Sequence, residues 1–92
     1  MLRAAAVITV KGRVQGVGYR YFAERLAAEH SITGWVMNMP DSSVALDVEG
    51  GREDLERFIE GLKAGPSMSR VSGVTVSWKP FQGLHRDFFI KY

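Results

Sequence analysis

The stretch that decides the fold is GRVQGVGYR, residues 12–20, which carries three glycines in nine positions. The apolar run before it, at residues 4–10, is typical of a buried strand. From Tyr19 onward, apolar residues recur at helical spacing as far as about His30. The stretch is therefore predicted to be a glycine-rich loop that joins the end of a strand to the N-terminus of a helix.

The remaining elements follow from their own patterns. Residues 33–39 read as a strand, and the turn residues PDSS separate it from a cleanly alternating strand at 43–49. Residues 52–65 carry one apolar stripe at helical spacing, and 71–79 and 87–92 read as two more strands. The order predicts one α+β domain over residues 1–92. We expect a ferredoxin-like βαββαβ sandwich, with both helices on one face of a mainly antiparallel sheet and a short fifth strand at the C-terminal end.

Composition excludes several classes of protein. The chain has 92 residues, 46% of them hydrophobic, and a net charge of +2, which is too mild to indicate a nucleic-acid-binding protein. Cysteine is absent, so disulfides, thiolate metal sites and cysteine nucleophiles are excluded. No segment approaches membrane-spanning length, and we expect a cytoplasmic protein that is a monomer.

The glycine loop is suited to holding an anion. The first N–H groups of a helix lack internal partners, and the helix dipole adds partial positive charge there. Glycines allow the backbone before the helix to approach a ligand closely and to aim further N–H groups at it. Phosphate is the most natural occupant. A plain connection, with glycine supplying positive φ, is the alternative.

Arg20 strengthens the case for an anion. It falls in the first helical turn, where a cation is disfavoured by roughly 0.3–1 kcal/mol unless an anion is bound beside it. Its planar guanidinium can hold two phosphate oxygens together. The alternative is a solvated surface arginine. Arg13 is a weaker candidate, because it lies at the start of the loop, away from the helix end.

Asn38 is the other residue that stands out. Asparagine is disfavoured in strands, yet Asn38 falls in one, on the same face as Val36. Its amide offers both a donor and an acceptor, which would hold a water molecule in one orientation. The alternative is that Asn38 prepares the turn that follows at Met39-Pro40-Asp41.

The two stretches together, GRVQGVGYR and GWVMNMPDSSVALDVEG (residues 34–50), resemble the acylphosphatase family, and the likeness runs to the closing FFIKY. The resemblance implies a metal-independent, cofactor-free enzyme that hydrolyses the carboxyl–phosphate bond of small-molecule acyl phosphates. It implies that Arg20 binds the phosphate and that Asn38 orients the attacking water. Inorganic phosphate or sulfate would be a product-like ligand. One departure is Ser42, where the family usually has glycine, which puts the hairpin turn in doubt.

The resemblance also implies that the backbone N–H groups of the loop face the phosphate. The residues concerned are Val14, Gln15, Gly16, Val17, Gly18 and Tyr19, with Arg20 beside them.

Other readings stay open at this point. A non-catalytic domain that binds acyl or carbamoyl phosphate, or an RNA-binding module, could use the same fold. We expect the two histidines, His30 and His85, to be structural, and no spacing suggests a metal site. Four aromatic residues are expected to lie in the core and not on an exposed surface where bases could stack: Trp35, Trp78, Phe22 and Phe58.

Overall fold

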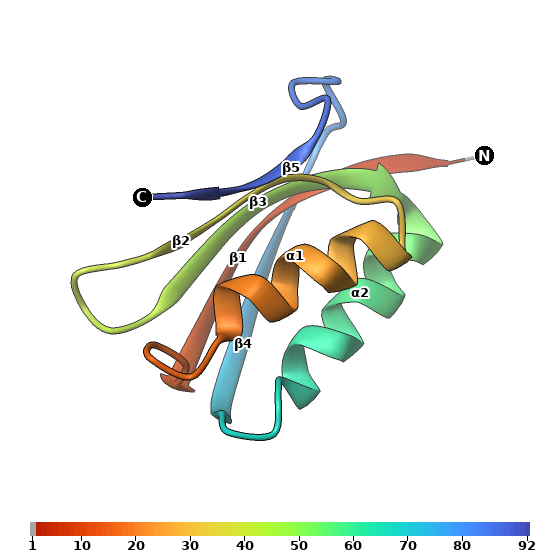
Figure 1. The fold of residues 1–92 in the computed structure, drawn as a ribbon. Helices are drawn as coiled ribbons and strands as arrows, with labels where there is room; N and C mark the ends of the chain where they lie inside the picture. The colour runs from red at the N-terminus through yellow and green to blue at the C-terminus, as the bar shows by residue number, and fades with distance from the viewer. Residues whose placement is uncertain (1) are drawn as a thin grey trace.

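Two helices cover one face of a single five-stranded sheet in the computed structural model, which describes residues 2–92 (Figure 1). The elements are β1 (Arg3–Arg13), α1 (Tyr19–Glu29), β2 (Thr33–Asn38), β3 (Val44–Gly51), α2 (Arg52–Ala64), β4 (Arg70–Lys79) and β5 (Phe88–Lys91). The strand order is β4-β1-β3-β2-β5. All neighbouring strands are antiparallel except β2 and β5, which are parallel. The predicted ferredoxin-like arrangement, including the short fifth strand, is confirmed.

The core lies between the sheet and the helices. Alternate residues of β1, at positions 4, 6, 8 and 10, face the helices and are buried. In β3 the same role falls to Val44, Leu46 and Val48, as the alternating pattern predicts. α2 packs onto this face through four buried residues, Leu55, Phe58, Ile59 and Leu62. α1 contributes Tyr19, Ala23 and Ala27.

β1 is longer than the apolar run suggested. It continues to Arg13, with a register shift against β4 between Lys11 and Gly12. Such an irregularity bends the strand and increases its twist. The strand therefore runs directly into the glycine loop that precedes α1.

The expectation that both tryptophans lie in the core is wrong, whereas Phe58 is buried and Phe22 packs against the core as expected. Trp35 alternates with buried Val36 and so lies on the sheet face without helices, where Lys91 Nζ is 4.8 Å from its ring centroid. Trp78 lies on the helix-facing side of β4, opposite Ala6, but it is 37% exposed, and Arg52 covers its ring with Cζ 3.7 Å from the ring centroid.

A buried carboxylate anchors the loop that connects β4 to β5. Glu49, 2% exposed, accepts hydrogen bonds at Oε2 from the backbone N–H groups of Gln82 (3.1 Å) and Gly83 (3.0 Å). Its Oε1 accepts a third from the N–H of His85 at 3.2 Å. Burial raises the pKa of Glu49, but these N–H donors outweigh burial and hold the pKa below its ordinary value.

This anchor gives a pH-dependent contribution to stability. Because the pKa of Glu49 is lower in the folded than in the unfolded protein, the contribution is present above the unfolded pKa and is lost as the pH falls through the folded one. We expect Glu49→Gln to lower the free energy of unfolding by about 2 kcal/mol at pH 7. Urea denaturation at pH 7, 4 and 2.5 should show that the difference in the free energy of unfolding between Glu49→Gln and the wild type becomes smaller as the pH falls. Glu29→Gln, at an exposed position, is the control. A difference in the free energy of unfolding that stays constant across this pH range would contradict the stabilising role of the Glu49 carboxylate.

Neither helix in the described part of the chain has the length and apolar character needed to cross a bilayer.

Candidate active site

The loop between β1 and α1 is built on two glycines in the left-handed conformation. Gly16 has φ 72° and Gly18, the residue that precedes α1, has φ 78°. Side chains other than glycine rarely adopt such values, and a Cβ at either position would meet no other atom within 4 Å. The positive φ therefore explains why both positions carry glycine, and steric crowding of a side chain does not.

The start of α1 has neither a side-chain cap nor a negative charge of its own. No side chain caps it, and its first turn holds no acidic residue, whereas α2 begins with Glu53 and Asp54. Within residues 2–92, the backbone N–H groups of residues 16–20 have no acceptor in hydrogen-bond range. Unpaired N–H groups at the positive end of a helix dipole attract an anion.

A cavity of about 200 Å³ lies at this helix start. It is lined by Val14, Gly16, Gly18, Tyr19, Arg20, Tyr21 and Asn38. The structure thus brings both catalytic candidates, Arg20 and Asn38, to one cavity together with most of the predicted loop. The remaining loop residues, Gln15 and Val17, do not line it.

Arg20 reaches the cavity from the first turn of α1. Among the described residues it forms no ion pair with an acidic side chain. Its guanidinium instead lies over the ring of Tyr92, with Cζ 4.9 Å from the ring centroid. A cation on an aromatic face keeps its hydrogen-bond donors available for a ligand. The contact of Tyr92 with Arg20 is not predictable from the sequence, since nothing local links Tyr92 to a loop at the other end of the chain.

Asn38 reaches the cavity from the last position of β2. Its register partner is Val44 of β3, whose buried side chain faces the helices. Asn38 Oδ1 is buried and has no hydrogen-bond partner among residues 2–92. A buried amide oxygen without a partner is costly, by about 1–3 kcal/mol, and is seldom kept without a use. This oxygen can accept a hydrogen bond from a water molecule or a ligand in the cavity.

Gln15 fastens the glycine loop to the β2–β3 hairpin. Its Nε2 donates to the carbonyl oxygens of Met39 and Ser43, both at 2.9 Å. These bonds tie the loop before Arg20 to the turn after Asn38, so the two halves of the site are fixed to each other. This side-chain role of Gln15 goes beyond the backbone N–H contact predicted for it.

Ser42 closes the hairpin in the geometry that glycine favours. Its φ is 74°, and its N–H donates to the carbonyl oxygen of Met39 at 3.1 Å. The serine therefore preserves a glycine-like turn at a strain of roughly 1–2 kcal/mol. Asp41 stabilises the same turn, since its Oδ1 accepts the N–H of Ser43 at 3.0 Å.

Tyr19 fixes the start of α1 against α2. Its ring is buried, and its hydroxyl donates to the carbonyl oxygen of Leu62 at 2.6 Å. Burial raises the pKa of Tyr19 far above its ordinary value, so the hydroxyl stays protonated and keeps donating. The side chain of Tyr19 is thus part of the core, and its backbone faces the cavity.

The other polar candidates lie elsewhere. Arg13, His30 and His85 do not line the cavity. His30 follows the last turn of α1, where its backbone N–H donates to the carbonyl oxygen of Leu26 at 3.1 Å. Across residues 2–92, no group of three or more histidine, aspartate or glutamate side chains is arranged to hold a metal ion.

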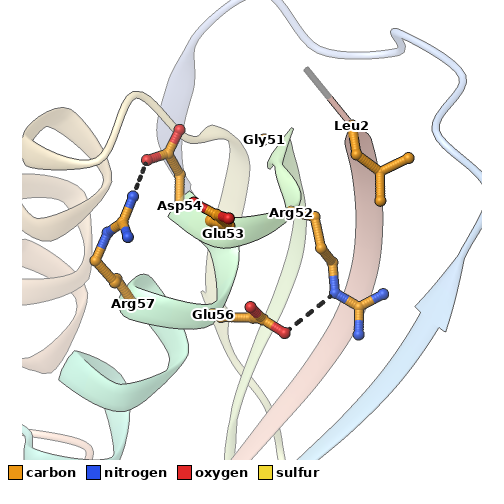
Figure 2. A pocket seen from close by; sticks show the side chains of 7 residues that line it. All are labelled: Leu2, Gly51, Arg52, Glu53, Asp54, Glu56 and Arg57. Carbon is orange, nitrogen blue, oxygen red and sulfur yellow. Dashed lines mark hydrogen bonds and ion pairs between the residues drawn. The ribbon is translucent and has the colours of Figure 1, made fainter.

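A larger pocket, of about 470 Å³, lies at the start of α2 (Figure 2). Figure 2 shows its two arginines bound to acidic neighbours: Arg57 pairs with Asp54 at 2.9 Å, and Arg52 Nε lies 3.5 Å from Glu56. With Glu53 also in its wall, acidic residues outnumber basic ones. This pocket is therefore unsuited to an anionic substrate, despite its size.

Comparison with known protein families identifies the family of this chain. The family model described as acylphosphatase matches residues 6–90, which is nearly the whole chain. The chain belongs to the acylphosphatase family. The resemblance seen in the sequence is thereby confirmed, and the chain is an enzyme of this family.

Known acylphosphatases share both its sequence and its fold. An acylphosphatase of Thermus thermophilus is 49% identical over 85% of this chain and 89% of that protein. One from Geotalea uraniireducens is 41% identical over 99% of this chain and its whole length. The crystal structure of acylphosphatase from Bacillus subtilis superposes with a TM-score of 0.93 at 37% identity, covering 97% of this chain and 99% of that one.

Proposed function

We propose that this acylphosphatase hydrolyses acyl phosphates by a mechanism that uses one guanidinium, one amide and the backbone of the glycine loop. Arg20 and the N–H groups of residues 14–19 hold the phosphate, and Asn38 orients the attacking water. Membership of the acylphosphatase family supports the reaction. The convergence of Arg20, the unpartnered Asn38 Oδ1 and the free loop N–H groups on one cavity supports these roles.

The chemistry requires positioning and charge stabilisation. The water oxygen attacks phosphorus in line with the carboxyl oxygen that leaves, the bond from phosphorus to that oxygen breaks, and its electron pair departs with the carboxylate. Arg20 and the loop N–H groups stabilise the charge on the three equatorial oxygens. Asn38 Oδ1 accepts a hydrogen bond from the water and so aims its lone pair at phosphorus.

No general acid is needed, because the leaving group is a carboxylate. Its conjugate acid has a pKa of about 4, so it departs without being protonated. The water proton passes to an oxygen of the substrate's own phosphate, since among the described residues that line the cavity there is no histidine and no carboxylate. The products are a carboxylate and inorganic phosphate.

The surroundings of the reaction are part of the same proposal. We propose a metal-independent, cytoplasmic monomer with a small-molecule acyl phosphate as substrate. The carboxylate leaves with its own negative charge, and Arg20 and the loop N–H groups offset the negative charge of the phosphate. A metal ion is therefore not required. The comparisons favour neither a silent phosphate-binding domain nor an RNA-binding module.

Substrate choice tests the proposed function. We expect steady hydrolysis of benzoyl phosphate that excess EDTA leaves unchanged. Phenyl phosphate should be cleaved at least about 10³-fold more slowly, because phenolate, with a pKa near 10, is a much poorer leaving group than a carboxylate. Release of inorganic phosphate measures both rates. Equal rates on the two substrates, loss of activity in EDTA, or salt-dependent retention of RNA without hydrolysis would contradict the proposal.

A further inference from the structure

The glycine loop and Arg20 account for the phosphate half of a substrate, and the acyl half needs a place of its own. If the proposed function holds, the loop N–H groups surround the phosphate oxygens and the water approaches from the side of Asn38. In-line displacement then sends the acyl group out on the side opposite the water. The accessible side chains that line the cavity there decide which acyl groups fit.

Tyr21 supplies the exposed apolar surface of the cavity wall. It follows Arg20 on α1, lines the same cavity and is 60% exposed. Tyr19 also lines the cavity, but its ring is not available, because it is buried in the core and its hydroxyl is bonded to Leu62. Tyr21 is therefore the one aromatic ring of the lining that a ligand can reach.

Tyr92 extends this surface. Tyr92 is 85% exposed, and its ring lies beneath the guanidinium of Arg20. The neighbouring Tyr21 hydroxyl raises the pKa of Tyr92, so the two side chains lie close together. Tyr21 and Tyr92, termed the aromatic rim below, thus stand beside the cation that binds the phosphate.

We propose that the aromatic rim is the acyl-group subsite and that Tyr21 is a specificity-determining residue, favouring aromatic over short aliphatic acyl phosphates. This inference rests on the proposed function and deepens it. An aromatic acyl group can stack on or meet the edge of the Tyr21 ring, whereas an acetyl group is too small to cover it. Catalysis itself stays with Arg20 and Asn38, so losing the ring changes substrate preference.

The test compares kcat/KM for benzoyl phosphate and acetyl phosphate. In Tyr21→Ala we expect the ratio of benzoyl to acetyl to fall about tenfold, with acetyl phosphate hydrolysis kept within about threefold. Tyr21→Phe keeps the ring and should keep the ratio. Phe89→Ala removes an exposed ring at a distant place, on the helix-free face of the sheet, and is the matched control.

Two results would overturn the proposal. An unchanged ratio in active Tyr21→Ala would show that the ring does not contact the acyl group. An equal loss on both substrates would show that Tyr21 acts only through Tyr92 on Arg20. Neither result would touch the proposed function, which would instead fail if the wild type hydrolysed neither substrate. A measurement without variants is inhibition of the wild type, where phenylphosphonate should bind about tenfold more tightly than methylphosphonate, and equal affinities would contradict the subsite.

Discussion

Arg20→Ala is expected to lower kcat/KM for benzoyl phosphate on the order of 10³-fold and to abolish measurable binding of inorganic phosphate. Arg20 is the one guanidinium in the cavity lining, and within residues 2–92 it has no acidic partner that competes for it. Removing it leaves the phosphate charge to the loop N–H groups alone. The measurements are steady-state kinetics and the inhibition constant of inorganic phosphate.

Two further variants and a stability measurement separate a loss of function from a loss of structure. Arg20→Lys keeps the positive charge but not the planar pair of donors, so we expect its kcat/KM to lie between that of Arg20→Ala and that of the wild type. Arg13→Ala, a change at the arginine outside the cavity, should stay within about threefold of the wild type. The free energy of unfolding of Arg20→Ala should change by less than about 1 kcal/mol, because Arg20 is only partly buried and has no ion-pair partner among the described residues. Retained phosphate binding in Arg20→Ala, or its loss in Arg13→Ala, would contradict the assignment.

Asn38→Ala is expected to lower kcat by about 10²-fold or more while the inhibition constant of inorganic phosphate changes less than about threefold. The reason is that, in the proposed mechanism, Asn38 Oδ1 holds the water and not the phosphate; this oxygen is buried and has no partner among the described residues. Asn38→Ala should therefore lose activity but keep inhibition by inorganic phosphate, whereas Arg20→Ala should lose both.

The matched control lies one residue earlier on the same strand. Met37 alternates with Asn38 and faces the other side of the sheet, so Met37→Ala should leave kcat close to that of the wild type. Normal turnover in Asn38→Ala would remove Asn38 from the mechanism. A parallel loss of phosphate binding would mean that the amide contacts the phosphate itself.

Local patterns were enough to predict the order of elements and the buried faces of β3 and α2. The alternation in residues 43–49 gave the buried face of β3, and the stripe at Leu55, Phe58, Ile59 and Leu62 gave the buried face of α2. These patterns succeed because each element must bury one face, and the period of that face is written within the element. For the same reason the glycine loop and Asn38 could be singled out as local anomalies.

Contacts between distant parts of the chain could not be predicted in this way. Gln15 bonds to carbonyl groups of the hairpin turn, Glu49 holds the loop before β5, and Tyr92 lies beneath Arg20. Each depends on where β5 and the loops run across the sheet, which no single element encodes. Packing could not be predicted either, since Trp78 lies on the helix-facing side of β4 but its ring is covered by Arg52.

The central claim is that one phosphate group is held between the guanidinium of Arg20 and the free N–H groups at the start of α1. Its most direct test is an NMR titration of the wild type with inorganic phosphate, following backbone amides and the Nε–H of Arg20. We predict saturable shifts concentrated at residues 16–20 and at Arg20 Nε–H, with an affinity equal to the inhibition constant. Shifts centred on the pocket at the start of α2, or none at the glycine loop at saturating phosphate, would contradict the account.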